Sequence, residues 1–139
     1  MRMLFITAIL CLAFPLQAIC ESKTEKEAAA IRAAEHFLML VDQGKYGESW
    51  DEASSLFVGH VSRDEWQRTI TSVRPPFGNP INRAVKLSKF MTSAPGVPDG
   101  EYVLIQFASS FEHKQSAIET VTTMFDKDGK WRVAGYFIK

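Results

Sequence analysis

Hydrophobic residues in the first half of the chain recur every three or four positions, which is the spacing of one face of an α-helix. Three helices are predicted, over residues 22–44, 46–59 and 62–73. The first and the third begin with a capping-box pattern, Ser22–Glu25 and Ser62–Glu65, whose side chains satisfy free backbone N–H groups. Pro75 ends the third helix, because proline lacks an N–H and disfavours helix in the preceding residue.

After Pro80 the apolar residues alternate with polar ones, which is the period of a β-strand with one solvated face. Arg83, Val85 and Leu87 are expected to share one side of this strand. Three further apolar runs, separated by turn-forming residues, predict strands over residues 102–107, 118–125 and 131–138. Helices followed by an antiparallel meander predict an α+β fold with the helices packed on one face of the sheet.

The N-terminus predicts export. Residues 1–18 have a basic start, an apolar stretch and the small residue Ala18 at the cleavage position, as in a signal peptide. The apolar stretch is shorter than the roughly 20 residues that span a bilayer, so no stable membrane anchor is expected. Bulky Ile19 disfavours lipid attachment at Cys20. Residues 22–139 are predicted to form a single domain in the periplasm or the medium.

The composition is that of a globular protein, with 46% hydrophobic and 23% charged residues. Lysine plus arginine and aspartate plus glutamate each number 16, so no attraction to nucleic acid is expected. The histidines His36, His60 and His113 are far apart in sequence, and no nucleophile elbow or metal-ligand motif is present. We therefore expect neither a cofactor nor a metal, and interpret Asp126–Gly129 as a turn.

The most informative charge is Glu119, which shares a strand face with the apolar residues Val121 and Phe125. A buried carboxylate must be paired or take up a proton, and Arg83 or Arg74 is the expected partner. Two interpretations are open. The pair holds sheet and helices in register, or the carboxylate contacts a ligand or acts as an acid–base group at a cavity floor.

Large aromatic residues are the second set of candidates for a site, namely Trp50, Trp66, Trp131 and Tyr136. Each has a large apolar area and one polar atom, which suits either the core or the wall of an apolar pocket. In the last strand, Trp131 is expected to share the buried face with Val133 and Phe137. If these aromatic residues line a pocket, its ligand is expected to be apolar or aromatic.

Several motifs together resemble a family of small exported bacterial proteins, domain of unknown function 4019. These are Leu40–Trp50, Val61–Ser62, Trp66, Arg74–Gly78, Arg83, Pro95–Tyr102, Phe107, Phe111–Lys114, Glu119–Val121 and Asp128–Ile138. The resemblance implies the cone-shaped fold of the nuclear transport factor 2-like, or cystatin-like, superfamily. In that fold three N-terminal helices pack on a strongly bent antiparallel sheet of about four strands. The superfamily includes isomerases, dehydratases and non-catalytic binding proteins, so the resemblance implies no particular reaction.

We therefore expect an exported, non-catalytic domain with a small apolar cavity, whose partner is a small apolar ligand or another envelope protein. One alternative is a cofactor-free isomerase or hydratase that uses Glu119 in its cavity. Another is a structural envelope protein that forms homodimers through the outer face of its sheet. An open cavity would favour the ligand, and a solidly packed interior would favour the interaction protein.

The leader generates the first testable prediction. The exported protein should begin at Ile19, so its intact mass should lack residues 1–18 and carry no lipid on Cys20. Mass spectrometry of the extracellular or periplasmic fraction measures this directly. Recovery of the uncleaved chain from the membrane fraction would contradict it.

Overall fold

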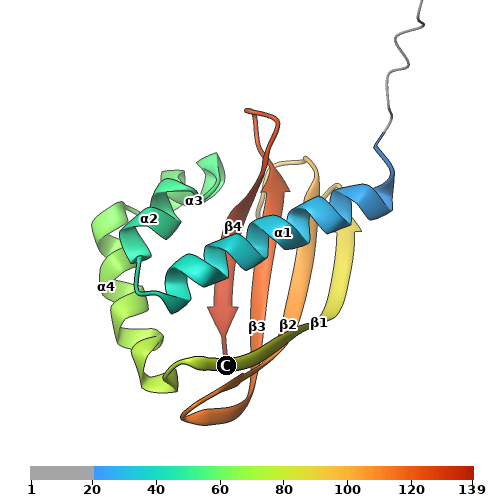
Figure 1. Cartoon of the computed structure of the whole chain (residues 1–139). Coiled ribbons are helices and arrows are strands. Elements are labelled where there is room, and N and C mark those ends of the chain that lie inside the picture. Colours follow the sequence, from blue (N-terminus) through green and yellow to red (C-terminus); the bar gives the residue numbers. More distant parts are fainter. Residues whose placement is uncertain (1–20) are drawn as a thin grey trace, which may run out of the picture.

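The computed structural model describes residues 21–139, so the predicted leader lies outside the described residues. Helices come first and a four-stranded sheet follows (Figure 1), which confirms the α+β class. The elements are α1 (Lys23–Asp42), α2 (Tyr46–Asp51), α3 (Ser55–His60), α4 (Arg63–Val73), the 3₁₀ turn η1 (Pro75–Phe77), β1 (Pro80–Met91), β2 (Tyr102–Phe111), β3 (Lys114–Phe125) and β4 (Trp131–Ile138). Among the described residues, no helix is both long and apolar enough to cross a bilayer.

The predicted capping residues begin their helices. Ser22 Oγ accepts from the backbone N–H of Glu25 at 3.2 Å, and the Glu25 carboxylate accepts from the backbone N–H of Ser22 at 2.7 Å, a complete capping box. At the start of α4, Ser62 Oγ accepts from the backbone N–H of Glu65 at 3.2 Å. Both boundaries could therefore be predicted because these interactions are local.

The predicted second helix is wrong in extent, since the structure divides it into α2 and α3 and so has four α-helices in its described part. The break lies at Ser54. Its backbone N–H donates to the carbonyl of Val133 in β4 at 2.9 Å, and its side chain caps α3 by accepting from Phe57 N–H at 3.2 Å. A bond to a distant strand therefore replaces the continuous helix, and the local sequence pattern contained no sign of that partner.

The four strands form one antiparallel sheet in the order β1-β2-β3-β4, and α1 crosses one of its faces (Figure 1). The core lies between this face and the helices. Its buried residues include Ala34, Phe37, Leu38 and Val41 from α1, Trp66 and Ile70 from α4, and Val103, Ile105, Phe107, Val121 and Val133 from the sheet. Burial of each large apolar side chain stabilises the fold by about 1.5 to 3 kcal/mol.

Two register shifts correct the predicted strand faces. In β1, Val85 pairs with Phe107 and Leu87 with Gln106, so Lys86 is an extra residue. The extra residue places Leu87 on the opposite face from Arg83, and Leu87 is 44% exposed. The expectation that Leu87 shares the side of Arg83 is therefore wrong.

The second shift lies in β4, where Thr123 pairs with Val133 and Thr122 with Gly135. Ala134 is the extra residue of this bulge. Beyond it the alternation is reversed, so Tyr136 lies on the face of Val133, while Phe137 is turned away and is 60% exposed. The expectation that Phe137 is buried is wrong, because a bulge depends on pairing that the strand's own sequence does not specify.

The turn between β3 and β4 anchors helix α3. The carboxylate of Asp126 accepts from the backbone N–H of Ser55 at 2.6 Å and from its hydroxyl at 2.7 Å. Gly129 has φ 77° and completes the turn predicted from the sequence, where a side chain would be strained. Burial raises the pKa of Asp126, but the bonds from Ser55 outweigh it, so the pKa is lowered.

The lowered pKa of Asp126 generates the second prediction. Its contribution to stability is present above the unfolded pKa of about 3.9 and is lost as the pH falls through the lower folded pKa. Asp126→Asn should reduce the free energy of unfolding by about 1 to 2 kcal/mol at pH 7. The difference from the unmodified protein should shrink as the pH is lowered below about 4 and the carboxylate takes up a proton. Urea melts at pH 7 and at a series of acidic pH values measure it.

The control is Asp128→Asn in the same turn. Asp128 pairs with Arg132 at the surface, where its side chain is 44% exposed, so its loss should change stability little. Equal losses for the two variants would contradict the role given to Asp126.

Candidate functional site

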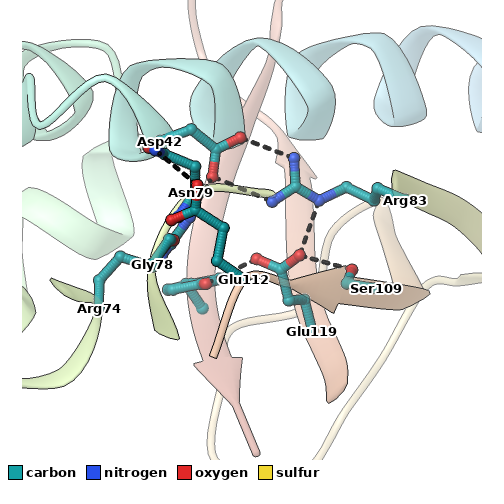
Figure 2. Close-up of polar contacts among 9 residues, drawn as sticks. Asp42, Arg74, Gly78, Asn79, Arg83, Ser109, Glu112 and Glu119 are labelled. Atoms are coloured by element: carbon teal, nitrogen blue, oxygen red, sulfur yellow. Dashed lines mark hydrogen bonds and ion pairs between the residues drawn. The ribbon is translucent and has the colours of Figure 1, made fainter. Parts of the chain in front are cut away.

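Four charged side chains from distant parts of the chain meet beside the helix-covered face of the sheet (Figure 2). They are Asp42 at the end of α1, Arg74 just after α4, Arg83 in β1 and Glu119 in β3, and we call them the ionic cluster. Two are acidic and two are basic, so their formal charges cancel. The ion pair between Arg83 and Glu119 was expected from the sequence and is confirmed.

Glu119 is fully buried, and three hydrogen bonds hold its carboxylate. One oxygen accepts from Arg83 Nε and from the hydroxyl of Ser109, each at 2.7 Å, and the other accepts from the hydroxyl of Tyr136 at 2.7 Å. Strands β1, β2 and β4 thus each supply a donor to a residue in β3. This arrangement satisfies the buried charge, whose desolvation would otherwise be costly.

Asp42 links both arginines. Its carboxylate accepts from Nη1 and Nη2 of Arg83 at 2.8 and 3.1 Å, the two-pronged geometry that suits a guanidinium group. It also accepts from Nη2 of Arg74 at 3.0 Å. A carboxylate at a helix C-terminus meets the negative end of the helix dipole, and the two guanidinium groups offset that repulsion.

Arg74 was considered as a partner of Glu119, but the structure pairs it with Asp42 instead. Its Nη1 donates to the carbonyl of Gly78 at 2.6 Å, and its guanidinium lies 4.4 Å from the ring centroid of Phe111. Within residues 21–139, Arg74 Nε and Trp131 Nε1 are the buried side-chain nitrogen or oxygen atoms that lack a hydrogen-bond partner. Most of the Arg74 guanidinium is therefore satisfied within the fold.

The pKa values of Arg83 and of the neighbouring Tyr136 are both raised. Burial lowers the pKa of Arg83, but its hydrogen bonds to Asp42 and Glu119 outweigh this effect and raise the pKa further above its ordinary range. Burial and the neighbouring Glu119 carboxylate raise the pKa of Tyr136, so its hydroxyl remains a donor. The arrangement suits structural pairing better than proton transfer.

A separate pocket of about 500 Å³ lies between α3, α4, β4 and the loop that connects β1 to β2. We call it the β4 pocket. Its lining residues are Leu56, Phe57, His60, Val61, Glu65, Trp66, Thr69, Gly96, Val97, Ala134, Gly135 and Tyr136. Glu119 does not line it, although the hydroxyl of Tyr136 connects the pocket wall to the ionic cluster.

The aromatic residues of the β4 pocket direct their polar atoms elsewhere. Trp66 Nε1 donates to the carbonyl of Tyr46 at 3.1 Å and to the hydroxyl of Ser49 at 3.0 Å, both inside the protein. The hydroxyl of Tyr136 is bound to Glu119. With Phe57, these rings leave an apolar wall without a free side-chain donor or acceptor.

Polar side chains lie at the mouth of the same pocket, where His60, Glu65 and Thr69 are exposed. His60 Nδ1 lies 2.8 Å from the carbonyl of Leu56, so Nδ1 carries the proton and Nε2 is left as an acceptor in the neutral ring. Across residues 21–139, no three histidine, cysteine or acidic residues lie together as a metal-binding group.

The structure places the candidate residues in different parts of the fold. Trp66 and Tyr136 line the β4 pocket, whereas Arg74 and Arg83 belong with Glu119 to the ionic cluster. The other two tryptophans lie elsewhere. Trp50 Nε1 donates to the carbonyl of Val61 at 2.7 Å, and Trp131 packs against Phe125 with ring centroids 5.5 Å apart.

Sequence reasoning missed Asp42 and Ser109 as members of the network around Glu119. Ser109 could have been found, because it alternates with Phe107 and Phe111 on the buried face of β2. Asp42 follows the apolar face of α1 directly, but nothing local indicates that two arginines from later segments reach it. It became recognisable as a site residue only in the folded chain.

The ionic cluster generates the third prediction. Arg83→Met should lower the free energy of unfolding by about 3 to 5 kcal/mol, because it leaves the buried Glu119 carboxylate without its cation. Glu119→Gln should lower it less, because Arg83 keeps its two bonds to Asp42. The double variant should lose less than the sum of the single losses. Denaturant melts of the four proteins measure the coupling.

The control is the same cycle on Arg63 and Asp51, an ion pair at the surface with side chains 44% and 49% exposed. This pair should show little coupling, because water and salt screen it. If the single variants at Glu119 and Arg83 keep the stability of the unmodified protein, the structural role of the cluster is wrong.

Comparison with known proteins agrees with the resemblance seen in the sequence. The model of the family described as "Protein of unknown function (DUF4019)" matches residues 33–136. This range contains the whole ionic cluster and all the lining residues of the β4 pocket. No curated protein matches the chain. The match covers most of the chain, and the chain therefore belongs to the DUF4019 family.

Proposed function

We propose that this protein is an exported, non-catalytic binding module that takes a small apolar ligand in the β4 pocket. The predicted leader supports export. The helices on one sheet face and the bulges in β1 and β4, which bend strands, support a cone-shaped fold like that of nuclear transport factor 2. In this proposal the ionic cluster shapes the site and performs no chemistry.

The apolar wall of the pocket carries the proposal. A volume of about 500 Å³ falls within the range of small-molecule sites. The side-chain polar atoms of Trp66 and Tyr136 are bound to Ser49 and Glu119, which do not line the pocket, so an apolar ligand against these rings would leave neither atom unpaired. A polar ligand would gain few hydrogen bonds from side chains there.

An isomerase or hydratase that uses Glu119 has less support. A general base must come within hydrogen-bond reach of its substrate. Glu119 is fully buried, accepts three hydrogen bonds and is not among the residues that line the β4 pocket. A ligand in that pocket would meet the ring of Tyr136 before it reached the carboxylate.

A homodimer formed through the outer face of the sheet is the second candidate. Leu87, Gln106, Thr120 and Phe137 are paired in one row across all four strands, with Leu87 and Phe137 44% and 60% exposed. Native mass spectrometry of the exported protein separates the two functions, because a ligand adds a small mass whereas a dimer doubles it.

The β4 pocket generates the fourth prediction. Thr69→Trp should fill the pocket mouth and weaken binding of the apolar fluorescent dye N-phenylnaphthylamine at least about tenfold, which is about 1.4 kcal/mol. Thr71→Trp is the matched control, because Thr71 is an exposed threonine of α4 that does not line this pocket. Fluorescence titration measures both. Equal binding by the two variants, or no binding to the unmodified protein, would contradict the proposed function.

A further inference from the structure

Strand β4 lies at the edge of the sheet, with β3 as its neighbour. Ile118 and Lys139 exchange two hydrogen bonds, of 2.9 and 3.1 Å, which makes them a closely bonded antiparallel pair. Bonded and unbonded pairs alternate along antiparallel strands, so Phe137 and Gly135 also direct their backbone groups toward β3. Tyr136 therefore directs its N–H and C=O groups away from the sheet.

The edge of β4 is closed on one side of the bulge and open on the other. The carbonyl of Val133 accepts from Ser54 N–H, so the start of α3 covers the edge there. No hydrogen bond from any described residue reaches the outward backbone groups of Tyr136. Ala134, Gly135 and Tyr136 all line the β4 pocket, so the open stretch of the edge lies at the pocket wall.

We propose that the β4 pocket binds an extended apolar peptide, which adds to β4 as a further antiparallel strand at Tyr136. This inference rests on the proposed function and names the ligand class. Peptide recognition at sheet edges combines main-chain hydrogen bonds with pockets for alternate side chains, and both elements are present here. Exposed edges are normally covered or blunted, so an open edge inside an apolar pocket is best explained by a partner strand.

The side chain of the peptide residue opposite Tyr136 would lie on the same face of the sheet as the Tyr136 ring. That ring lies 6.4 Å from the centroid of Trp66, which lies 5.1 Å from that of Phe57. An apolar side chain at this position therefore meets the aromatic wall of the pocket. Glu65 is the acidic residue among those that line the pocket, and its negative charge at the mouth favours neutral or basic peptides over acidic ones.

Methylated peptides give the fifth prediction. Capped pentapeptides with valine at the second and fourth positions and phenylalanine, leucine or valine at the centre should displace N-phenylnaphthylamine from the mature protein. Methylation of one backbone nitrogen removes a donor and keeps the side chains. In an added strand, the backbone N–H groups of alternate residues point toward β4. One peptide methylated at the central nitrogen and another methylated at the adjacent nitrogen should therefore differ about tenfold in their affinity for the protein.

Nuclear magnetic resonance supplies a second readout, since the amide proton of Tyr136 should shift and exchange more slowly with the peptide bound. If both methylated peptides bind as well as the unmodified ones, or if none of the peptides displaces the bound dye, strand addition is wrong although the apolar pocket stands. If the dye itself does not bind, the proposed function fails first. The two failures are therefore distinguishable.

Discussion

The ionic cluster is the interaction on which the rest of the structure depends. Asp42, Arg74, Arg83 and Glu119 come from α1, the end of α4, β1 and β3, and their bonds tie the helical layer to the sheet. Charges buried in this way are costly unless every one is paired. Two acids and two bases meet this requirement together, so the positions of four separate segments depend on one another.

The same network shapes the β4 pocket. The hydroxyl of Tyr136 donates to the Glu119 carboxylate, and its ring lines the pocket. The indole N–H of Trp66 donates to the carbonyl of Tyr46 and the hydroxyl of Ser49. The aromatic wall of the pocket is apolar because the side-chain polar atoms of Trp66 and Tyr136 are bound to residues that do not line the pocket. Packing of a charged network behind an aromatic wall thus produces a surface suited to apolar ligands, and this links the stability of the fold to its proposed function.

The bulges in β1 and β4 change which face of the sheet the following side chains occupy. One extra residue, Lys86 or Ala134, reverses the alternation that follows it. Leu87 lies on the face opposite Arg83 as a result, Phe137 becomes exposed, and Tyr136 takes the inward position at which it can reach Glu119. In β4, a single irregularity in pairing therefore turns Phe137 out of the core in which it was expected and directs Tyr136 to the opposite face.

The sequence by itself determined whatever depends on neighbours along the chain. Helix starts at Ser22 and Ser62, the strand segments and the inward face of Glu119 follow from capping motifs and from alternation. Arg83 could also be inferred as a partner of Glu119, since a buried carboxylate requires a cation. The tertiary structure alone decided the helix break at Ser54, the two bulges, the membership of Asp42 in the ionic cluster and the β4 pocket. Each depends on contacts between segments far apart in the chain, and their relative placement is a property of the packed fold, which local patterns do not encode.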